Sequence, residues 1–388
     1  MKLTFDIKTF IDAANWVGKT FDHRSNSSYI ALSVNSDSQA HLFYLNSTSY
    51  MKAPFIVSHV DLSDEETDSD DRKVFALDGV FLSKLSSVLS GSSGNATMKR
   101  KKGSMEVLTQ SGKFSIPTVE KKVQQEPDLT DIGEVDERQY FEALKNLSKL
   151  CDNTGSGPSL SSVDISFKDD TIVLMATDRY VLGEITVPFD PSNNIERYMK
   201  DREGKNLLLP VENAALISPS KNGSVSTTLV YDEKSKKFGY QFLDGRVSIF
   251  SLNNAEPLAY LKLKENASKG NTETVTIETK QLKQAISSVS NVSWEEKEIV
   301  LNIASDGSLK VHDLVESNTV SVPVLESHVS QDFSPKFSRV IINEAFYPIT
   351  TSKVVMKWAP DGMTFVFEPL TEDDKIVDSV FVFFIRSK

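Results

Sequence analysis

The sequence contains a single cysteine, Cys151, among its 388 residues, so it cannot form an internal disulfide bond. That composition fits a reducing compartment. The sequence also lacks any apolar run of about 18 residues, the length that a membrane-spanning helix needs. Its first ten residues, MKLTFDIKTF, lack the apolar stretch of a secretory signal peptide. These absences predict a cytoplasmic protein with no membrane association.

Several patterns that carry chemistry are missing as well. The five histidines are scattered without the spacing of metal ligands, and no Gly-x-Ser-x-Gly sequence is present. Residues 90–97 are rich in glycine and serine but lack the Gly-Lys-Ser/Thr of a phosphate-binding loop. The acidic run at 64–71 lacks the glycine and glutamate of an EF-hand, so we interpret it as a solvated loop. We therefore expect no enzymatic activity, no metal and no cofactor.

Positive charge is in the minority, with 43 Lys and Arg against 54 Asp and Glu and a net charge of −11. This balance argues against a general nucleic-acid binder, which usually has a basic domain. It still allows a protein that gathers its basic residues on one surface while the remainder is acidic. The arrangement of the lysines along the chain therefore matters more than their number.

The most informative segment is the amphipathic helix predicted over residues 136–151. Tyr140, Leu144, Leu147 and Cys151 recur at helical spacing and form an apolar stripe. The opposite face is mostly basic, and Asp136 can cap the start of the helix. That polar face consists of Arg138, Glu142, Lys145 and Lys149.

The same unit of short strand, polar cap and amphipathic helix occurs three times, about 130 to 140 residues apart. The first copy begins at residue 3 and the third at residue 275, and each helix again has an apolar and a polar face. A shorter second helix is predicted in each unit, over residues 78–89, 211–217 and 343–351, and hairpins of strands fill the rest. Lysines on the polar faces of the first and third helices are Lys8, Lys19, Lys280 and Lys283.

This threefold repeat predicts an α+β fold with three domains, each a sheet that carries two helices on one face. We place the domains at residues 1–126, 134–264 and 272–388. The connecting segments are expected to be linkers over residues 127–133 and 264–271, the second of which is rich in Lys, Gly and Ser.

Short motifs then connect the chain to a known family. The strand Leu174-Met175-Ala176-Thr177-Asp178, the opening Met1-Lys2-Leu3-Thr4-Phe5 and the closing Phe381-Val382-Phe383-Phe384-Ile385-Arg386 all fall where that family has similar segments. Together with the repeat, they resemble the bacterial DNA polymerase III beta subunit, the DNA sliding clamp. The resemblance covers essentially the whole chain, and the order and spacing of the motifs carry most of its weight.

The resemblance implies a head-to-tail homodimer whose six domains form a ring, with the helices lining the hole. Such a ring encircles double-stranded DNA without reading its sequence, because phosphate contacts position a protein but do not specify bases. It would tether the replicative DNA polymerase as a processivity factor and would be loaded by a clamp loader. The candidate DNA-binding residues are Lys8, Lys19, Arg24, Arg138, Lys145, Lys149, Lys280 and Lys283, with Arg24 assigned from the resemblance alone.

The family also binds its polymerase and clamp loader through short linear peptides, in an apolar pocket between the middle and last domains. Carried over position by position, that partner-peptide pocket would contain Leu160, Thr177, Tyr180, Val181, Leu182, Pro257, Leu261, Phe381 and Phe383. The alternative interpretation of these phenylalanines is an ordinary hydrophobic core.

Two departures and several rival interpretations remain open. Arg179-Tyr180-Val181-Leu182 replaces the family's Gly-His-Arg-Leu, and Phe383-Phe384-Ile385-Arg386 replaces its Met-Pro-Met-Arg. These differences suggest a divergent clamp, and a phage origin is one interpretation of them. Three repeats argue against the two-domain trimeric clamps of archaea and eukaryotes. A repeat-built scaffold protein without DNA encirclement is the main alternative, and a degenerate enzyme would need polar groups that converge in one pocket.

Overall fold

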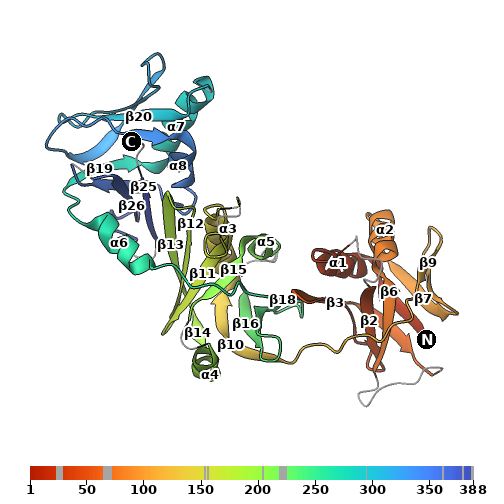
Figure 1. The fold of residues 1–388 in the computed structure, drawn as a ribbon. Coiled ribbons are helices and arrows are strands. Elements are labelled where there is room, and N and C mark those ends of the chain that lie inside the picture. Colours follow the sequence, from red (N-terminus) through yellow and green to blue (C-terminus); the bar gives the residue numbers. More distant parts are fainter. Residues whose placement is uncertain are drawn as a thin grey trace. The chain divides into compact units, whose positions relative to one another are not determined.

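A computed structural model describes residues 1–22, 29–63, 72–152, 154, 157–202, 205–217, 225–293, 295–360, 362–377 and 380–385. Within these ranges the chain forms two compact units, each built from antiparallel sheets and helices (Figure 1). No helix in the described part of the chain is both long and apolar enough to cross a bilayer. Unit 1 comprises Met1–Glu134, Ser192–Glu196 and Val225–Ser251, and unit 2 comprises Val135–Pro191, Arg197–Ser224 and Leu252–Lys388.

Two sheets build unit 1, and helices α1 (Ile7–Gly18) and α2 (Gly79–Leu89) pack against each other in it. The smaller sheet has the order β5 (Val57–Asp61), β1 (Lys2–Asp6), β7 (Asn95–Lys101), β8 (Ser104–Leu108), β9 (Lys113–Pro117). The larger sheet has the order β14 (Asp190–Pro191), β10 (Leu129–Asp136), β16 (Ser226–Asp232), β17 (Lys237–Phe242), β18 (Val247–Phe250), β4 (Ser49–Phe55), β3 (Ala40–Leu45), β2 (Tyr29–Asn35), β6 (Arg72–Asp78). Strands from two different repeats therefore pair side by side, at β18 and β4.

Unit 2 repeats this construction with a nine-stranded and a four-stranded sheet. The first has the order β15 (Leu207–Pro210), β11 (Ser162–Lys168), β12 (Thr171–Thr177), β13 (Val181–Pro188), β27 (Val380–Ile385), β26 (Thr364–Leu370), β25 (Lys353–Trp358), β19 (Glu273–Glu278), β23 (Val324–His328). The second has the order β22 (Thr319–Val322), β21 (Leu309–His312), β20 (Glu298–Ile303), β24 (Lys336–Ser338). Pairing of β13 with β27 joins the second repeat to the third in one continuous sheet.

The predicted threefold repeat is confirmed. Each repeat opens with a strand that leads directly into a long helix, as in β1–α1, β10–α3 (Glu137–Ser148) and β19–α7 (Thr279–Val292), and contains a shorter second helix, α2, α5 (Val211–Ala214) or α8 (Arg339–Glu344). The predicted domain boundaries remain a prediction, because the two compact units divide the middle segment between them. Two further helices, α4 (Ile195–Asp201) and α6 (Tyr260–Ser268), and a two-residue strand, β14 (Asp190–Pro191), complete the described elements.

Side-chain caps begin two of the three long helices. Asp6 Oδ1 accepts a hydrogen bond of 2.8 Å from Thr9 N, and Asp136 Oδ1 accepts one of the same length from Gln139 N. A cap of this kind stabilises a helix by about 1 kcal/mol. The buried face of α3 contains Tyr140, Leu144 and Leu147, as the periodicity predicts.

Three predicted boundaries were wrong. Residues 129–133 belong to strand β10 because Ile132 and Val135 are buried in it, so the first linker ends earlier. Residues 264–268, which were expected in the second linker, belong to α6, and Tyr260 and Ala267 hold this helix against the sheet. Helix α8 begins at Arg339, four residues earlier than expected, directly after strand β24.

Gly239 lies where strands β17 and β18 approach too closely for a side chain. A Cβ atom there would lie 1.9 Å from the Ser248 carbonyl oxygen and 2.5 Å from Ile249 Cα, both backbone atoms of the neighbouring strand. We predict that Gly239→Ala destabilises the protein by about 1 to 3 kcal/mol, because the strands must separate. Thermal melting should show the loss, whereas Gly18→Ala should melt like the wild type because its Cβ would have no neighbour within 4 Å. Equal melting temperatures for both variants would contradict the close approach.

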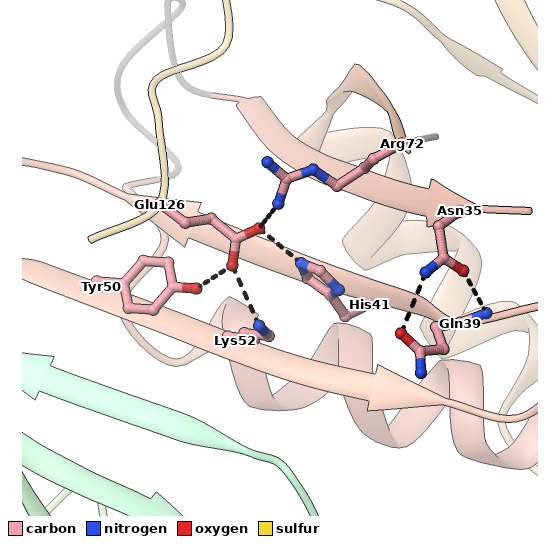
Figure 2. Close-up of polar contacts among 7 residues, drawn as sticks. All are labelled: Asn35, Gln39, His41, Tyr50, Lys52, Arg72 and Glu126. Atoms are coloured by element: carbon pink, nitrogen blue, oxygen red, sulfur yellow. Dashed lines mark hydrogen bonds and ion pairs between the residues drawn. The ribbon is translucent and has the colours of Figure 1, made fainter. Parts of the chain in front are cut away.

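The segment between the first two repeats is attached to unit 1 by a half-buried carboxylate. Figure 2 shows Glu126 surrounded by four donors from β3, β4 and β6. Tyr50 Oη donates to Glu126 Oε2 at 2.6 Å, and His41 Nε2 lies 2.9 Å from Oε1. Lys52 Nζ lies 3.3 Å from Oε2, and Arg72 Nη1 lies 3.4 Å from Oε1. Val123 and Leu129 of the same segment pack on the apolar cluster of that sheet face.

Because these donors stabilise the carboxylate, the segment should be held less firmly in acid. Burial alone would raise the pKa of Glu126, but the hydrogen bond and charge of His41, with Lys52 and Tyr50, outweigh it and lower the pKa to about 2. A pKa below the ordinary value of 4.5 means that the stabilisation is complete above about pH 5 and is lost as the pH falls toward 2.

We predict that Glu126→Gln lowers the stability of the protein at pH 7 by on the order of 3 kcal/mol, the free energy that corresponds to this pKa difference. The gap in melting temperature between wild type and variant should shrink to roughly half or less when the pH is lowered from 7 to 3. Glu120→Gln is the control, because Glu120 is an exposed carboxylate of the same segment. A gap of constant size across this pH range would show that the ion cluster does not provide the stability.

Candidate functional site

The long helix of each repeat presents basic side chains on its solvent-exposed face. Lys8 and Lys19 are exposed on and just after α1, and Lys280 is exposed on α7. On α3, Arg138 and Lys145 are exposed, and Arg138 Nε lies 3.2 Å from Glu142 Oε1 one turn later. That pairing leaves the α3 face less basic than its arginine and lysine count suggests. Arg24 lies outside the described residues.

Two lysines from different repeats come together in unit 2. The Lys149 ammonium, at the end of α3, lies 4.7 Å from the centre of the Tyr347 ring. Lys283 of α7 donates from Nζ to the Ile349 carbonyl oxygen at 3.2 Å, and its ammonium lies 5.3 Å from the Phe346 ring. Burial and then the charge of Lys149 lower the pKa of Lys283. Two like charges held near each other attract an anion to the space they share.

Unit 1 contains a similar pair. The Lys19 ammonium lies 4.3 Å from the centre of the Trp16 ring system, and the Arg246 guanidinium lies 4.4 Å from it. Partial desolvation of the ammonium beside the Trp16 ring, followed by the charge of Arg246, lowers the pKa of Lys19 although most of its side chain is exposed. The helical pattern could not reveal Arg246 because this residue follows a turn beside β18, far from α1 in sequence.

A polar hollow between α7 and α8 adds a further cation. It has a volume of about 380 Å³, and its wall includes Arg339, Ser287 and Asn343. Arg339 Nη1 donates to the Ser290 carbonyl oxygen at 2.9 Å, which positions the guanidinium there. The sequence analysis missed Arg339 because it placed the start of this helix too late.

The apolar residues expected to form a partner-peptide pocket lie around the junction of β13 and β27 in unit 2. Leu182 pairs directly with Phe383, and Glu184 with Phe381, across the two strands. All four project from one face of the sheet because alternate residues of a strand point the same way. Leu182, Phe381 and Phe383 form one buried cluster there with Val173, Met175, Val366, Tyr260 and Ala267.

Among the other predicted pocket residues, Thr177 pairs directly with Leu182 across β12 and β13. Tyr180 is 53% exposed and Leu261 67% exposed. Leu160 and Pro257 are half-buried on two segments that a hydrogen bond from Ser159 Oγ to the Glu256 carbonyl oxygen joins. Val181 differs, because it lies on the opposite face of the strand from Leu182. It is buried and pairs with Phe384, so it supports the core and cannot line the same surface as Leu182.

The turn after Thr177 is tightly hydrogen-bonded. Thr177 Oγ1 donates to the Val181 carbonyl oxygen at 2.6 Å, and Asp178 Oδ1 accepts from the backbone nitrogens of Tyr180 and Val181. Arg179 has a φ of +87°, a backbone conformation that favours glycine, which is the residue the resembled family has there. Burial, followed by the nearby Asp178 carboxylate, raises the pKa of Glu344 in α8 to about 7.

Within the described ranges, no group of three or more His, Cys, Asp or Glu side chains is arranged to hold a metal ion. The site therefore consists of basic helix faces on one hand and an apolar sheet surface on the other. The first suits a polyanion, because exposed lysines and arginines pair with phosphate groups. The second suits apolar side chains of a peptide.

Comparison with solved structures finds the same fold in bacterial DNA polymerase III beta subunits. The sliding clamp of Bacillus subtilis matches with a TM-score of 0.80 and 13% identity over 100% of this chain and 99% of that one. The beta subunit of Thermotoga maritima matches with a TM-score of 0.76 and 14% identity over 100% and 99%. The Helicobacter pylori beta clamp bound to a DNA ligase peptide matches with a TM-score of 0.77 and 16% identity over 100% of both chains. These matches confirm the fold that the sequence resemblance implied.

By contrast, the sequence matches no protein-family model and no curated protein.

Proposed function

We propose that the protein is a DNA sliding clamp, which encircles duplex DNA and tethers a replicative DNA polymerase without catalysing a reaction itself. The observation that carries this proposal is the full-length fold similarity to sliding clamps, combined with basic residues on the long helix of every repeat. An unrelated scaffold protein would have no reason to place lysines on the same helix face three times.

The chemistry of the basic helix faces fits sliding better than site-specific binding. Lysine and arginine side chains attract phosphates at long range, and such contacts carry no base sequence information. The remaining surface is acidic enough to give a net charge of −11, which discourages DNA from binding elsewhere. Retention would then depend on encirclement, and tight contacts would only hinder movement along the duplex.

Encirclement by a chain of three repeats requires a second copy, and both ends of the chain offer suitable surfaces. Strand β9 ends the smaller sheet of unit 1 and leaves a backbone edge for a further strand. In the third repeat, Val292, Leu314 and Val315 are 63%, 42% and 69% exposed. The 2.8 Å hydrogen bond from Ser293 Oγ to Asp313 Oδ2 fastens their two segments together. We propose that these two surfaces join head to tail in a homodimer.

The proposed partners are the DNA polymerase and the clamp loader, each bound through a short linear peptide. The Helicobacter pylori clamp bound to a DNA ligase peptide shows that this fold can accept a peptide. The apolar surface around Leu182, Phe381 and Phe383 is the proposed binding site in this chain. A location in the cytoplasm, where replication takes place in bacteria, follows from the same proposal.

Imaging of single particles by electron microscopy tests the assembly. At a concentration where mass measurement finds two copies, we expect closed rings with a six-part outline and a hole wide enough for a DNA duplex. Dimers without a hole would support the scaffold alternative and refute the clamp.

A further inference from the structure

Helix α6 covers the surface that we propose for partner peptides. Its Tyr260 and Ala267 are only 4% and 2% exposed, and they pack on the sheet residues of the same cluster. As a result, Phe381 and Phe383 are 8% and 7% exposed although both project from the face of a sheet. A peptide could contact these rings fully only if α6 moved aside. Figure 1 shows α6 as the helix beside β26.

One side chain of α6 makes a double contact with the strands below. Lys264 Nζ lies 2.8 Å from Glu184 Oε1 and 4.7 Å from the centre of the Phe381 ring. Glu184 and Phe381 are direct cross-strand neighbours, so a single ammonium bridges β13 and β27. The Glu184 side chain is 13% exposed, and its carboxylate would lose this partner if α6 moved away.

Apart from Tyr260 and Ala267, little in α6 favours its position on the sheet. The helix has nine residues, and isolated helices this short are marginal in water. Its preceding residue, Ala259, provides no side-chain cap within the described structure. Leu261 and Leu263 are 67% and 40% exposed, so part of its apolar surface gains nothing from the sheet. Burial of Tyr260 and Ala267 and a hydrogen bond from Thr364 Oγ1 to the Ala267 carbonyl oxygen also hold the helix, and Lys264 adds the polar link to both strands.

We propose that α6 is a built-in cover of the partner-peptide pocket, latched by Lys264, and that a partner peptide binds only when α6 leaves the sheet face. The incoming peptide replaces Tyr260 with an apolar or aromatic side chain of its own and offers a basic side chain to Glu184. The apparent affinity of the peptide is then reduced by the fraction of molecules in which α6 is closed. This inference rests on the proposed peptide pocket, but the movement of α6 can be measured without any partner.

Hydrogen exchange of the whole protein tests the latch. In Lys264→Gln, we expect the backbone amides of α6 to exchange about tenfold faster, because a partly exposed ion pair and a cation–π contact are lost. The double variant should resemble Lys264→Gln, which already removes both contacts, whereas Glu184→Gln should have the smaller effect of the two single variants because it keeps the contact between Lys264 and the Phe381 ring. Lys264→Arg and Lys262→Gln should exchange like the wild type, because the first keeps the charge and the second changes an exposed lysine of the same helix. Unchanged exchange of α6 in Lys264→Gln would overturn the latch.

Binding of a labelled peptide with the sequence of residues 257–269 tests the cover. This probe carries the equivalents of Tyr260 and Lys264, so it should compete for the exposed sheet face. We expect Lys264→Gln to bind it several-fold more tightly than the wild type, and we expect the double variant to bind it less tightly than Lys264→Gln because Glu184 is then absent. Faster exchange of α6 without tighter probe binding would overturn the cover. Neither measurement involves DNA or a polymerase, so their outcome is independent of whether the protein is a clamp.

Discussion

Replacing Lys145 and Lys149 with glutamate is expected to weaken binding to duplex DNA by at least about tenfold and to flatten its dependence on salt. A ring of two copies would lose four cations, and each phosphate contact contributes about 0.9 to the slope of log K against log salt. The slope should therefore fall by about 3 to 4 if all four lysines contact phosphates. The substitution at position 149 also affects Lys283. Its ammonium now lies near the positive charge of Lys149, which, after burial, lowers its pKa, whereas a carboxylate at position 149 would attract that ammonium.

Anisotropy of a labelled linear duplex, titrated at several salt concentrations, measures both quantities. The matched control is Lys168→Glu with Lys234→Glu, which makes the same change in net charge at two exposed lysines, one at the end of β11 and one in the turn between β16 and β17. This control should bind DNA nearly as the wild type does. If both double variants lose affinity equally, overall charge is responsible and the assignment to the helix faces is wrong.

Glutamate at Val292 and Val315 is expected to convert the dimer into single copies. Both valines are more than 60% exposed in one chain and lie on the proposed dimer surface of the third repeat. Burial of an unpaired carboxylate costs several kcal/mol, and two per interface exceed what a typical interface can offset. Native mass spectrometry across a range of protein concentrations should show single copies where the wild type shows pairs.

Leu243→Glu provides the control for this experiment, because Leu243 is 81% exposed in the turn between β17 and β18, which belongs to neither of the two proposed dimer surfaces. It should remain dimeric and melt like the wild type. A dimeric Val292→Glu, Val315→Glu variant would show that the third repeat uses another surface for assembly.

The repeat could be predicted from sequence because each copy contains local signals of a strand followed by a helix. A polar cap such as Asp136 followed by apolar residues at helical spacing determines where α3 begins and which side it buries. Helix α6 has no comparable signal: no capping side chain precedes it, and Leu261 and Leu263 stay exposed. Its position depends on Tyr260 meeting a sheet whose strands come from two distant parts of the chain.

The residues of the candidate sites likewise fall into those that local sequence patterns could place and those that only tertiary packing brings together. Helical spacing sufficed to place Lys145 and Lys280 on exposed faces. It could not indicate that Lys149 approaches Lys283, or that Arg246 lies against Trp16, because tertiary packing alone brings these pairs together. Likewise, a list of pocket residues taken from a continuous motif included Val181, which strand alternation directs away from Leu182.

Retention on circular DNA tests the central claim most directly. The protein is incubated at high concentration with a nicked plasmid, so that spontaneously opened rings can load, and free protein is removed by gel filtration in high salt, which suppresses phosphate contacts. The sliding-clamp account predicts that protein stays with the circular plasmid and is released when a restriction enzyme linearises it. Equal retention on circular and linear DNA would contradict encirclement. So would the absence of retention on circular DNA under conditions where microscopy shows closed rings.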